Sequence, residues 1–186
     1  MSNGQHGQLP PSAWVCRFAG LIAAGGAVLD LACGQGRHAR YLAGLGYKVE
    51  ALDCDSAALA SLAGVAGVAT RCADVEKAPW PYRPGSFDGV VVSNYLHRPL
   101  AADLLTSLRP GGVLIYETFA LGNENLGRPS NPEFLLRTHE LLGWVEGRLQ
   151  VVAFEQGLVA LPKPAVVQRI CAVRRETAQC RLDLPH

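Results

Sequence analysis

Three aspartates and two glycines in the first half of the chain have the types and spacing that a polar ligand site requires. Asp30 comes shortly before Gly34 and Gly36 in the stretch AVLDLACGQGRHA, and Asp53 and Asp74 follow further along the chain. Carboxylates accept hydrogen bonds from hydroxyl and amino groups, and glycines let the backbone approach a ligand closely. The pattern therefore predicts a binding site for a small polar molecule.

The glycine stretch also fits the fingerprint of dinucleotide-binding proteins, because its letters read Gly34-x-Gly36-x-x-Ala39. Asp30 argues against a dinucleotide. A carboxylate about 4 Å from one unit charge of a pyrophosphate costs roughly 4 kcal/mol at the effective dielectric of a protein surface. The acid favours a cationic ligand instead. On these residues alone, a second interpretation stays open, in which Asp30 only caps the turn.

The elements that position these residues alternate between apolar runs and helical patterns. Strands are expected at 28–31, 47–52, 65–72, 87–92 and 113–118, with a last pair at 149–156 and 165–173. Helices are expected at 13–24, 36–45, 56–64, 99–108 and 132–142, with Ser12, Asp55 and Asn131 at helix starts. Three prolines predict no helix at 76–86. The chain is therefore expected to be α/β, with a doubly wound, mostly parallel seven-stranded sheet.

Two further features follow from this order of elements. The connection between the last two strands is too short for a crossover helix, so the last strand should be antiparallel. Asp30, Asp53 and Asp74 each stand at the carboxyl end of a predicted parallel strand, where ligands bind in such sheets. Each acid alone has a structural explanation, but all three in register with a glycine turn favour a common site.

These residues resemble class I S-adenosylmethionine-dependent methyltransferases, in which a strand, an acid and a glycine turn are followed by SFD, here at 86–88, and LRPGG, here at 108–112. Within that family the ACGxGR turn is most similar to small stand-alone enzymes of the tellurite-resistance type. The resemblance covers roughly residues 12–175 and implies a Rossmann-like methyltransferase fold with S-adenosyl-L-methionine as cofactor. Ala32 departs from the family, where glycine is commoner, but its small side chain should be tolerated.

The resemblance also implies roles for individual residues. Asp53, 17 residues after Gly36, is close to the roughly 20 expected for a carboxylate that accepts the ribose hydroxyls. Asp74 is implied to accept from the adenine amino group, and Asn94 to lie against the methionine end. The implied cofactor-binding set is Asp30, Ala32, Gly34, Gly36, Asp53, Cys54, Asp74, Val75 and Asn94. Arg17 is a candidate for a ligand carboxylate, although such an arginine is more often solvated.

Methyl transfer from a sulfonium is an in-line displacement, so positioning alone can supply up to roughly 7 to 11 kcal/mol. A general base is needed only where the acceptor carries a proton. His97 is the first candidate, followed by Glu117, Tyr95 and His38. A lone histidine is nevertheless more often structural. No metal site is expected, because the six cysteines are scattered without a CxxC pair.

Composition narrows the partners and the location. A net charge of +1 over 186 residues lacks the basic footprint of nucleic-acid binders and the polybasic segment of membrane-surface binders. The apolar run at 18–29 is too short to span a bilayer. With scattered cysteines and no signal segment, we expect a cytoplasmic protein without membrane or nucleic-acid partners. The expected organisation is a flexible N-terminus at 1–11, a methyltransferase domain at 12–175 and a tail at 176–186.

The segment after the fourth predicted strand bears on the class of acceptor. Residues 93–96, SNYL, lack the Pro-Pro-aromatic segment with which similar nucleic-acid amine methyltransferases hold a flipped base. A small molecule or a metalloid is therefore the leading acceptor, with RNA and protein as minor alternatives. The polar, glycine-rich loop at 119–131 is expected beside the ligand site. Two rival functions stay open, an NAD-binding oxidoreductase and a non-catalytic S-adenosylmethionine-binding module.

Overall fold

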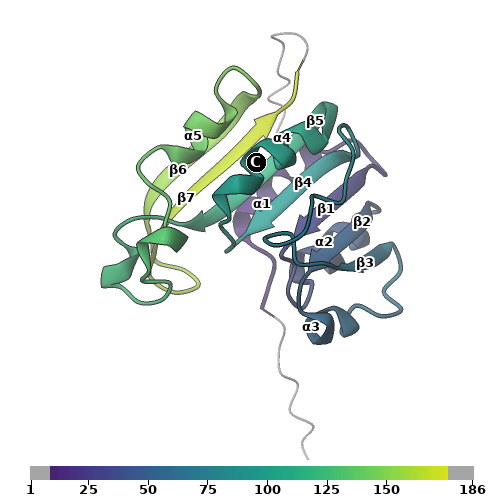
Figure 1. The fold of residues 1–186 in the computed structure, drawn as a ribbon, viewed down its shortest axis with the longest axis horizontal. Coiled ribbons are helices and arrows are strands. Elements are labelled where there is room, and N and C mark those ends of the chain that lie inside the picture. The colour runs from purple at the N-terminus through teal and green to yellow at the C-terminus, as the bar shows by residue number, and fades with distance from the viewer. Residues whose placement is uncertain (1–8, 176–186) are drawn as a thin grey trace, which may run out of the picture.

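Seven strands form one sheet through the middle of the molecule, in the order β3-β2-β1-β4-β5-β7-β6 (Figure 1). In this computed structural model, β1 to β5 run parallel, whereas β7 is antiparallel to both of its neighbours. The predicted fold class is thus confirmed. The strands are β1 Ala27–Leu31, β2 Lys48–Asp53, β3 Val68–Cys72, β4 Phe87–Ser93, β5 Leu108–Phe119, β6 Gln150–Val159 and β7 Ala165–Val173.

The structure describes residues 9–175. The expected tail at 176–186 lies outside the described residues, as do the first eight residues of the expected flexible N-terminus at 1–11. The limits of the predicted domain at 12 and 175 stay a prediction.

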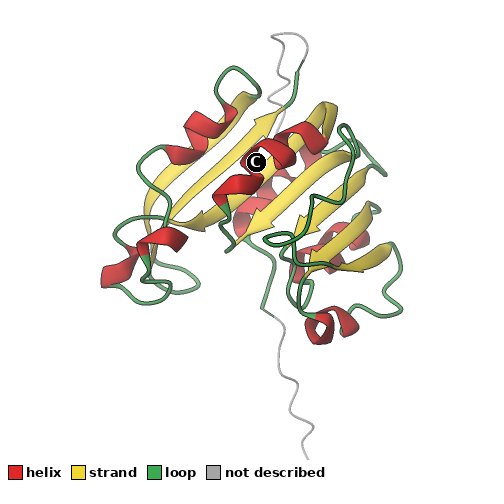
Figure 2. Cartoon of the chain, viewed as in Figure 1, coloured by secondary structure: helices red, strands yellow, loops and turns green. Residues whose placement is uncertain are grey.

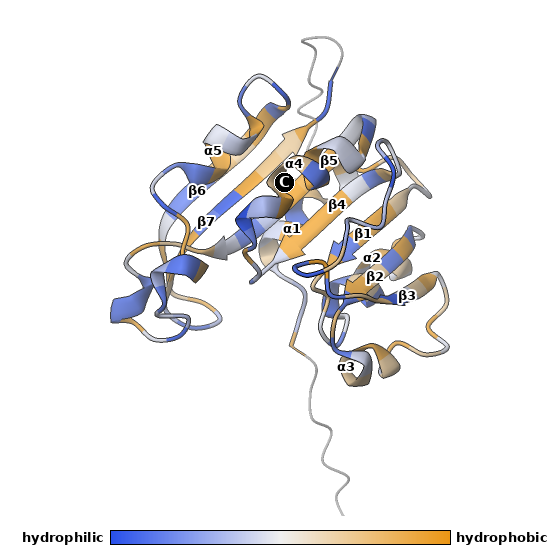
Figure 3. Ribbon diagram, viewed as in Figure 1, coloured by the Kyte–Doolittle hydropathy of each residue, from blue (hydrophilic) through white to orange (hydrophobic). Residues whose placement is uncertain are grey.

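Short helices cover both faces of the sheet (Figure 2). Helix α1 contacts β5, and α2 and α3 each contact β2 and β3. Helix α4 contacts β4 and β5, and α5 contacts β6 and β7. Two separate clusters of buried apolar side chains result, one on each face, and they give the strands their apolar colour in Figure 3. The helices are α1 Ala13–Phe18, α2 Arg37–Gly44, α3 Ser56–Ala60, α4 Ala101–Ser107 and α5 Glu140–Val145.

The predicted helix starts at Ser12 and Asp55 are confirmed. The Ser12 side chain accepts a hydrogen bond from the Trp14 amide, and the Asp55 carboxylate accepts from two amides of α3. Both helices are shorter than expected. Helix α1 is followed by a 3-10 turn over Ala19–Leu21, which precedes β1.

The predicted helix at 132–142 is wrong in its middle. Asn131 does cap a turn at Pro132–Phe134, but the chain then leaves helical geometry and α5 begins only at Glu140. Leu135 is extended, and Leu136 pairs beside the end of β5, where its amide donates to the Phe119 carbonyl at 2.9 Å and its carbonyl accepts from the Leu121 amide at 3.0 Å. The Arg98 guanidinium donates to the Glu133 and Leu135 carbonyls at 2.7 and 2.8 Å and so also holds this non-helical segment.

The segment 76–86 has no helix, as the prolines predict. Aromatic side chains cover the sheet there instead. Trp80 packs edge-on against Tyr82, which packs in the same way against Phe87. The Trp80 indole donates to Ser107 Oγ at 2.9 Å, and the Tyr82 hydroxyl donates to Glu50 at 3.0 Å. These bonds hold a loop where related folds would have a helix.

Candidate functional site

A glycine turn joins β1 to α2 at the carboxyl edge of the sheet. Gly34 and Gly36 have φ values of +54° and +76°, and Ala32 has a φ of +50°. Residues with side chains rarely adopt this left-handed region. A Cβ on Gly36 would lie 2.4 Å from Leu62 Cδ2, whereas the corresponding position on Gly34 has no atom within 4 Å. The turn is packed on one side and open on the other.

Asp30 lies beneath this turn, inside β1, with 1% of its surface exposed. One carboxylate oxygen accepts from the Ala39 amide, but Oδ2 is buried without a hydrogen-bond partner among the described residues. Burial raises the pKa of Asp30 to about 7, although Arg37 acts in the opposite direction. A buried, unpartnered acceptor of this kind is rare in folded proteins unless a ligand or water satisfies it.

Asp53 lies at the end of β2 and contacts the glycine turn directly. Its Oδ2 accepts from the Gly34 amide at 2.8 Å, and its Oδ1 accepts from the Asp55 amide at 2.9 Å. Each carboxylate oxygen can accept a further bond. The structure thus brings together two of the sequence-predicted residues, Asp53 and Gly34, that lie 19 positions apart.

Asp74 and Val75 follow β3. The Asp74 carboxylate pairs with Lys77 at 2.8 Å, and this hydrogen bond lowers the pKa of Asp74. Val75 is buried. The pKa of the exposed Cys54 thiol is raised, first by partial desolvation and then by the nearby carboxylates of Asp53 and Asp74. The ends of β2 and β3 therefore form one acidic edge.

Asn94 follows β4 with a φ of +58°, and its amide donates to the Glu117 carbonyl at 2.9 Å. It lines two cavities, one of about 600 Å³ and one of about 250 Å³. Phe119, at the end of β5, lines both as well. Asn94 is therefore positioned at the junction of the two hollows.

The smaller cavity is lined by one of the catalytic candidates and by Glu76, a carboxylate that contacts two of them. Tyr95 lines it, and its hydroxyl donates to Glu76 Oε1 at 3.0 Å. His97 Nδ1 lies 3.8 Å from the other oxygen of the same carboxylate. Burial raises the pKa of Tyr95, so its hydroxyl stays protonated near neutral pH and does not act as a base. Glu76, which sequence reasoning missed, carries no motif of its own and is recognised only through these contacts.

Glu117 lines the larger cavity, away from that group. Its Oε1 accepts from Ser12 Oγ at 2.7 Å, and its Oε2 pairs with Arg169 at 3.4 Å. The Glu117 side chain is 13% exposed. The structure therefore does not join Glu117 to Tyr95 and His97.

His38 is buried in α2, and its Nε2 accepts from the Ser12 amide at 3.1 Å. Burial and the neighbouring Arg37 lower the pKa of His38 to about 4. The imidazole is thus neutral near pH 7 and holds the start of α1 in place.

Arg37, the first residue of α2, lines the larger cavity and was not singled out in the sequence. Its guanidinium donates to the Pro10 carbonyl at 3.3 Å and to Ser93 Oγ at 3.1 Å. Arg17, which was singled out, pairs with Glu155 at 3.4 Å and is half exposed. The feature of the sequence that could have identified Arg37 as a cavity residue is its position directly after Gly36.

Within residues 9–175, no three histidine, cysteine or acidic side chains are grouped as a metal would require. Nor does any helix in that part of the chain combine the length and apolarity needed to cross a membrane.

Comparison with known proteins gives a family match for part of this chain. Residues 28–112 match the family model described as a methyltransferase domain. That range runs from β1 to the start of β5 and includes every residue of the implied cofactor-binding set. No curated protein sequence matches the chain significantly.

Solved structures share the fold. The chain is similar to TehB from Haemophilus influenzae, with a TM-score of 0.73 and 21% identity, over 87% of this chain and 61% of that one. An S-adenosylmethionine-dependent methyltransferase from Methanosarcina mazei has a TM-score of 0.68 and 15% identity, over 90% and 99%. The 1,6-didemethyltoxoflavin-N1-methyltransferase of Burkholderia thailandensis, with bound 1,6-didemethyltoxoflavin and S-adenosylhomocysteine, has a TM-score of 0.64 and 20% identity, over 88% and 77%. This chain thus spans less than two thirds of the TehB chain.

Proposed function

We propose that this chain, a class I S-adenosylmethionine-dependent methyltransferase by its fold and by the family model that residues 28–112 match, methylates a small organic acceptor. The observation that carries the proposal is the buried Oδ2 of Asp30, which has no partner beneath the open side of the Gly34 turn. A cationic group entering the turn would satisfy that oxygen, as the ammonium of the cofactor can. The pyrophosphate of NAD would instead meet a buried acid.

The cofactor site follows from the residues around the turn. Asp30 binds the ammonium, and Asp53, already bonded to Gly34, accepts the ribose hydroxyls with its remaining lone pairs. Asn94 lies at the methionine end, and Arg37 supplies a guanidinium for the methionine carboxylate. The other proposed contacts are with Ala32, Gly36, Cys54, Asp74 and Val75. The bound cofactor supplies a methyl group on a sulfonium.

The protein's own contribution is to orient the acceptor and, where needed, to remove a proton. His97 is the proposed base. With Nδ1 facing the Glu76 carboxylate at 3.8 Å, Nε2 is the atom left to accept a proton from the acceptor. Glu76 then stabilises the imidazolium, and Tyr95 holds Glu76 in place through its 3.0 Å hydrogen bond. Glu117 has a positioning role, because both of its oxygens already have partners.

The size of the larger cavity favours an organic acceptor over a metalloid. About 600 Å³ lies within the range of about 300 to 1,000 Å³ in which proteins bind drug-sized molecules. Ten of its sixteen lining residues are apolar, so most of the wall offers contacts to a carbon skeleton. The B. thailandensis protein is one neighbour whose bound acceptor is a small organic molecule. Cytoplasmic location stays a prediction.

A transfer assay with the complete chain tests this function. The protein would be incubated with S-adenosylmethionine labelled in the methyl group and with separate small-molecule, RNA and protein fractions of a cell extract, alongside tellurite and selenite. Label is expected in the small-molecule fraction. Label confined to RNA, protein or metalloid products would refute the proposed acceptor class. Binding of cofactor without any transfer would favour a binding module, and a thermal shift with NADH alone would favour an oxidoreductase.

A further inference from the structure

We infer that the acceptor carries an anionic group on an apolar body and that Lys163 binds this anion at the larger cavity. The inference rests on the proposed function, since it concerns the acceptor of the same site. It goes further by assigning the charge of the acceptor and the side chain that recognises it.

The walls of the cavity come from several distant parts of the chain, including Arg37 of α2. Residues 9–13 form one side, the ends of β4 and β5 form the floor, and the β6–β7 hairpin forms the other side. The apolar contributions include Leu9, Phe119, Val159 and Leu161. A body of aromatic or aliphatic carbon therefore has contacts on several sides.

The charges in this wall are unequal. Arg37, Lys163 and Arg169 are cationic, and Glu117 is the one acidic lining residue among those that the structure describes. Glu117 is already neutralised, because it pairs with Arg169 and accepts a hydrogen bond from Ser12. The cavity thus presents excess positive charge to any molecule that enters it.

The three cations differ in their availability. Arg169 also pairs with Glu155 on β6, so two carboxylates hold its guanidinium. Arg37 donates to Pro10 and Ser93, and the proposed cofactor site uses it for the methionine carboxylate. Lys163 is exposed and has no ion pair or hydrogen bond within the described part of the chain. It is therefore the cation that remains for an acceptor.

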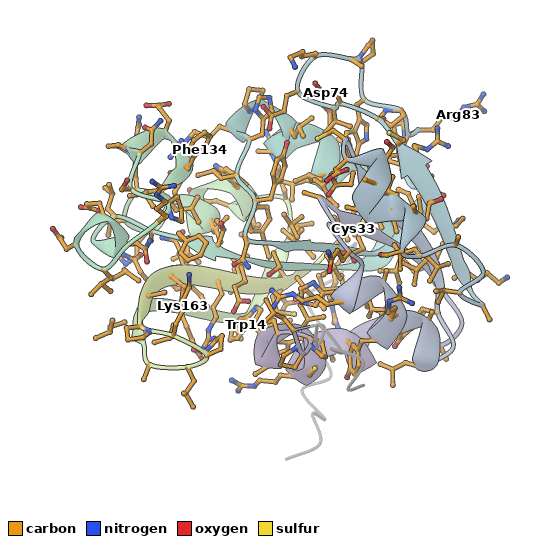
Figure 4. All side chains as sticks on the ribbon, turned by 90° about the horizontal axis from the view of Figure 1, so that it is seen from below. Trp14, Cys33, Asp74, Arg83, Phe134 and Lys163 are labelled. Atoms are coloured by element: carbon orange, nitrogen blue, oxygen red, sulfur yellow. The ribbon has the colours of Figure 1, made fainter. Side chains whose placement is uncertain are left out.

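The position of Lys163 also suits a recognition residue. It lies in the turn between β6 and β7, flanked by Pro162 and Pro164, and in Figure 4 it is labelled on the same side of the sheet as Trp14. Prolines restrict the backbone on both sides, so less conformational freedom is lost when the side chain binds a ligand. Phe134 and Asp74 are labelled on the other side. Asn94 and Phe119 line both cavities, so an acceptor anchored at Lys163 would have to extend past these two residues to bring a proton to His97.

Two fluorescent probes with the same body test the inference. 1-Anilinonaphthalene-8-sulfonate carries an anion, whereas N-phenyl-1-naphthylamine is its uncharged counterpart. Each is titrated into the complete chain, with and without saturating S-adenosylhomocysteine. Lys163→Glu should weaken binding of the sulfonate about tenfold and change binding of the neutral probe less than about twofold, as expected for one reversed charge near a solvated ligand.

Two further variants serve as controls. Lys48→Glu makes the same charge change at an exposed residue on the amino end of β2, away from the carboxyl edge, and should leave both affinities unchanged. Val159→Trp places a large ring in the cavity wall and should weaken both probes. The inference is overturned if the sulfonate keeps its affinity in Lys163→Glu, if Lys48→Glu has an equal effect, or if both probes still bind to Val159→Trp.

The result is separable from the proposed function. Calorimetry with S-adenosylhomocysteine measures the cofactor site directly, and Lys163→Glu should not change that affinity. If the wild-type chain does not bind S-adenosylhomocysteine, the proposed function is refuted. The probe titrations without cofactor would still decide the charge preference of the cavity.

Discussion

Ser12 Oγ donates a hydrogen bond of 2.7 Å to Glu117 Oε1, which joins the start of α1 to β5 across 105 residues of chain. The Ser12 amide donates to His38 Nε2, and Ser12 Oγ accepts from the Trp14 amide. One serine thus connects the N-terminal wall of the larger cavity to α2 and to the sheet. Glu117 completes this connection by pairing with Arg169 on β7.

Replacing Glu117 by glutamine should therefore affect stability more than chemistry. Loss of the charged hydrogen bonds should lower the free energy of unfolding by about 1 to 2 kcal/mol, since bonds to charged groups contribute about 1.5 to 3 kcal/mol and glutamine keeps part of the geometry. Urea denaturation measures this loss, and methyl transfer should stay within about threefold of wild type. Glu155→Gln, at the exposed partner of Arg169, is the control. Unchanged stability with a hundredfold loss of turnover would make Glu117 the base.

Asp30→Asn should stabilise the ligand-free protein at neutral and alkaline pH. Burial raises the pKa of Asp30 to about 7 from 3.8, so its unfolded form loses the proton first. The protonated Asp30 carboxyl contributes fully to the stability of the folded protein below pH 4, and this contribution is lost as the pH rises through 7. At 1.36 kcal/mol per pH unit, the variant should gain about 4 kcal/mol relative to wild type between pH 4 and 8. Urea denaturation of both proteins across this range measures the difference, in which the titration of His38 cancels.

The same ionisation should control cofactor affinity. A cationic ligand binds the charged form of Asp30, so the wild-type affinity for S-adenosylhomocysteine should rise as the pH passes from about 5 to 8. Asp30→Asn should show weaker binding at pH 8, by about tenfold or more, and little pH dependence. Calorimetry at several pH values measures both. An affinity of the variant equal to wild type at pH 8 would place the cationic group elsewhere.

Asp53→Ala should weaken binding of S-adenosylhomocysteine about tenfold, because it removes a hydrogen-bond acceptor for the ligand and the 2.8 Å bond that holds the Gly34 amide. The matched control is Asp55→Ala, two residues further on. Asp55 caps α3 through two amides, so its loss should cost about 1 kcal/mol of stability and leave affinity unchanged. Equal affinity in both variants would mean that Asp53 does not contact the ligand.

His97→Gln should lower turnover of a proton-bearing acceptor about a hundredfold, within the range of about 10² to 10⁴ that general bases supply. Affinity for S-adenosylhomocysteine should not change. Glu76→Gln removes the charge 3.8 Å from Nδ1 and should have a smaller effect in the same direction. Steady-state transfer rates as a function of pH measure both variants. Normal rates in both would remove the pair from the mechanism.

The sequence by itself was sufficient for the strands, the glycine turn and the helix starts at Ser12 and Asp55. The apolar run before Asp30, the glycines after it and the caps at Ser12 and Asp55 depend on residues within a few positions of each other. Local sterics and short-range hydrogen bonds decide such features, so they can be recognised without knowledge of the rest of the chain.

Only the tertiary structure decided which charged side chains are available. Glu117 has the residue type of a base, but Ser12 and Arg169 occupy its oxygens from 105 and 52 residues away. The expected helix at 132–142 is interrupted where Leu136 pairs with Phe119 and Leu121 beside the end of β5. Burial leaves Oδ2 of Asp30 without a partner, and topology joins Glu76 to His97. These pairings form only when distant strands meet, and no local pattern records which partner a side chain will find.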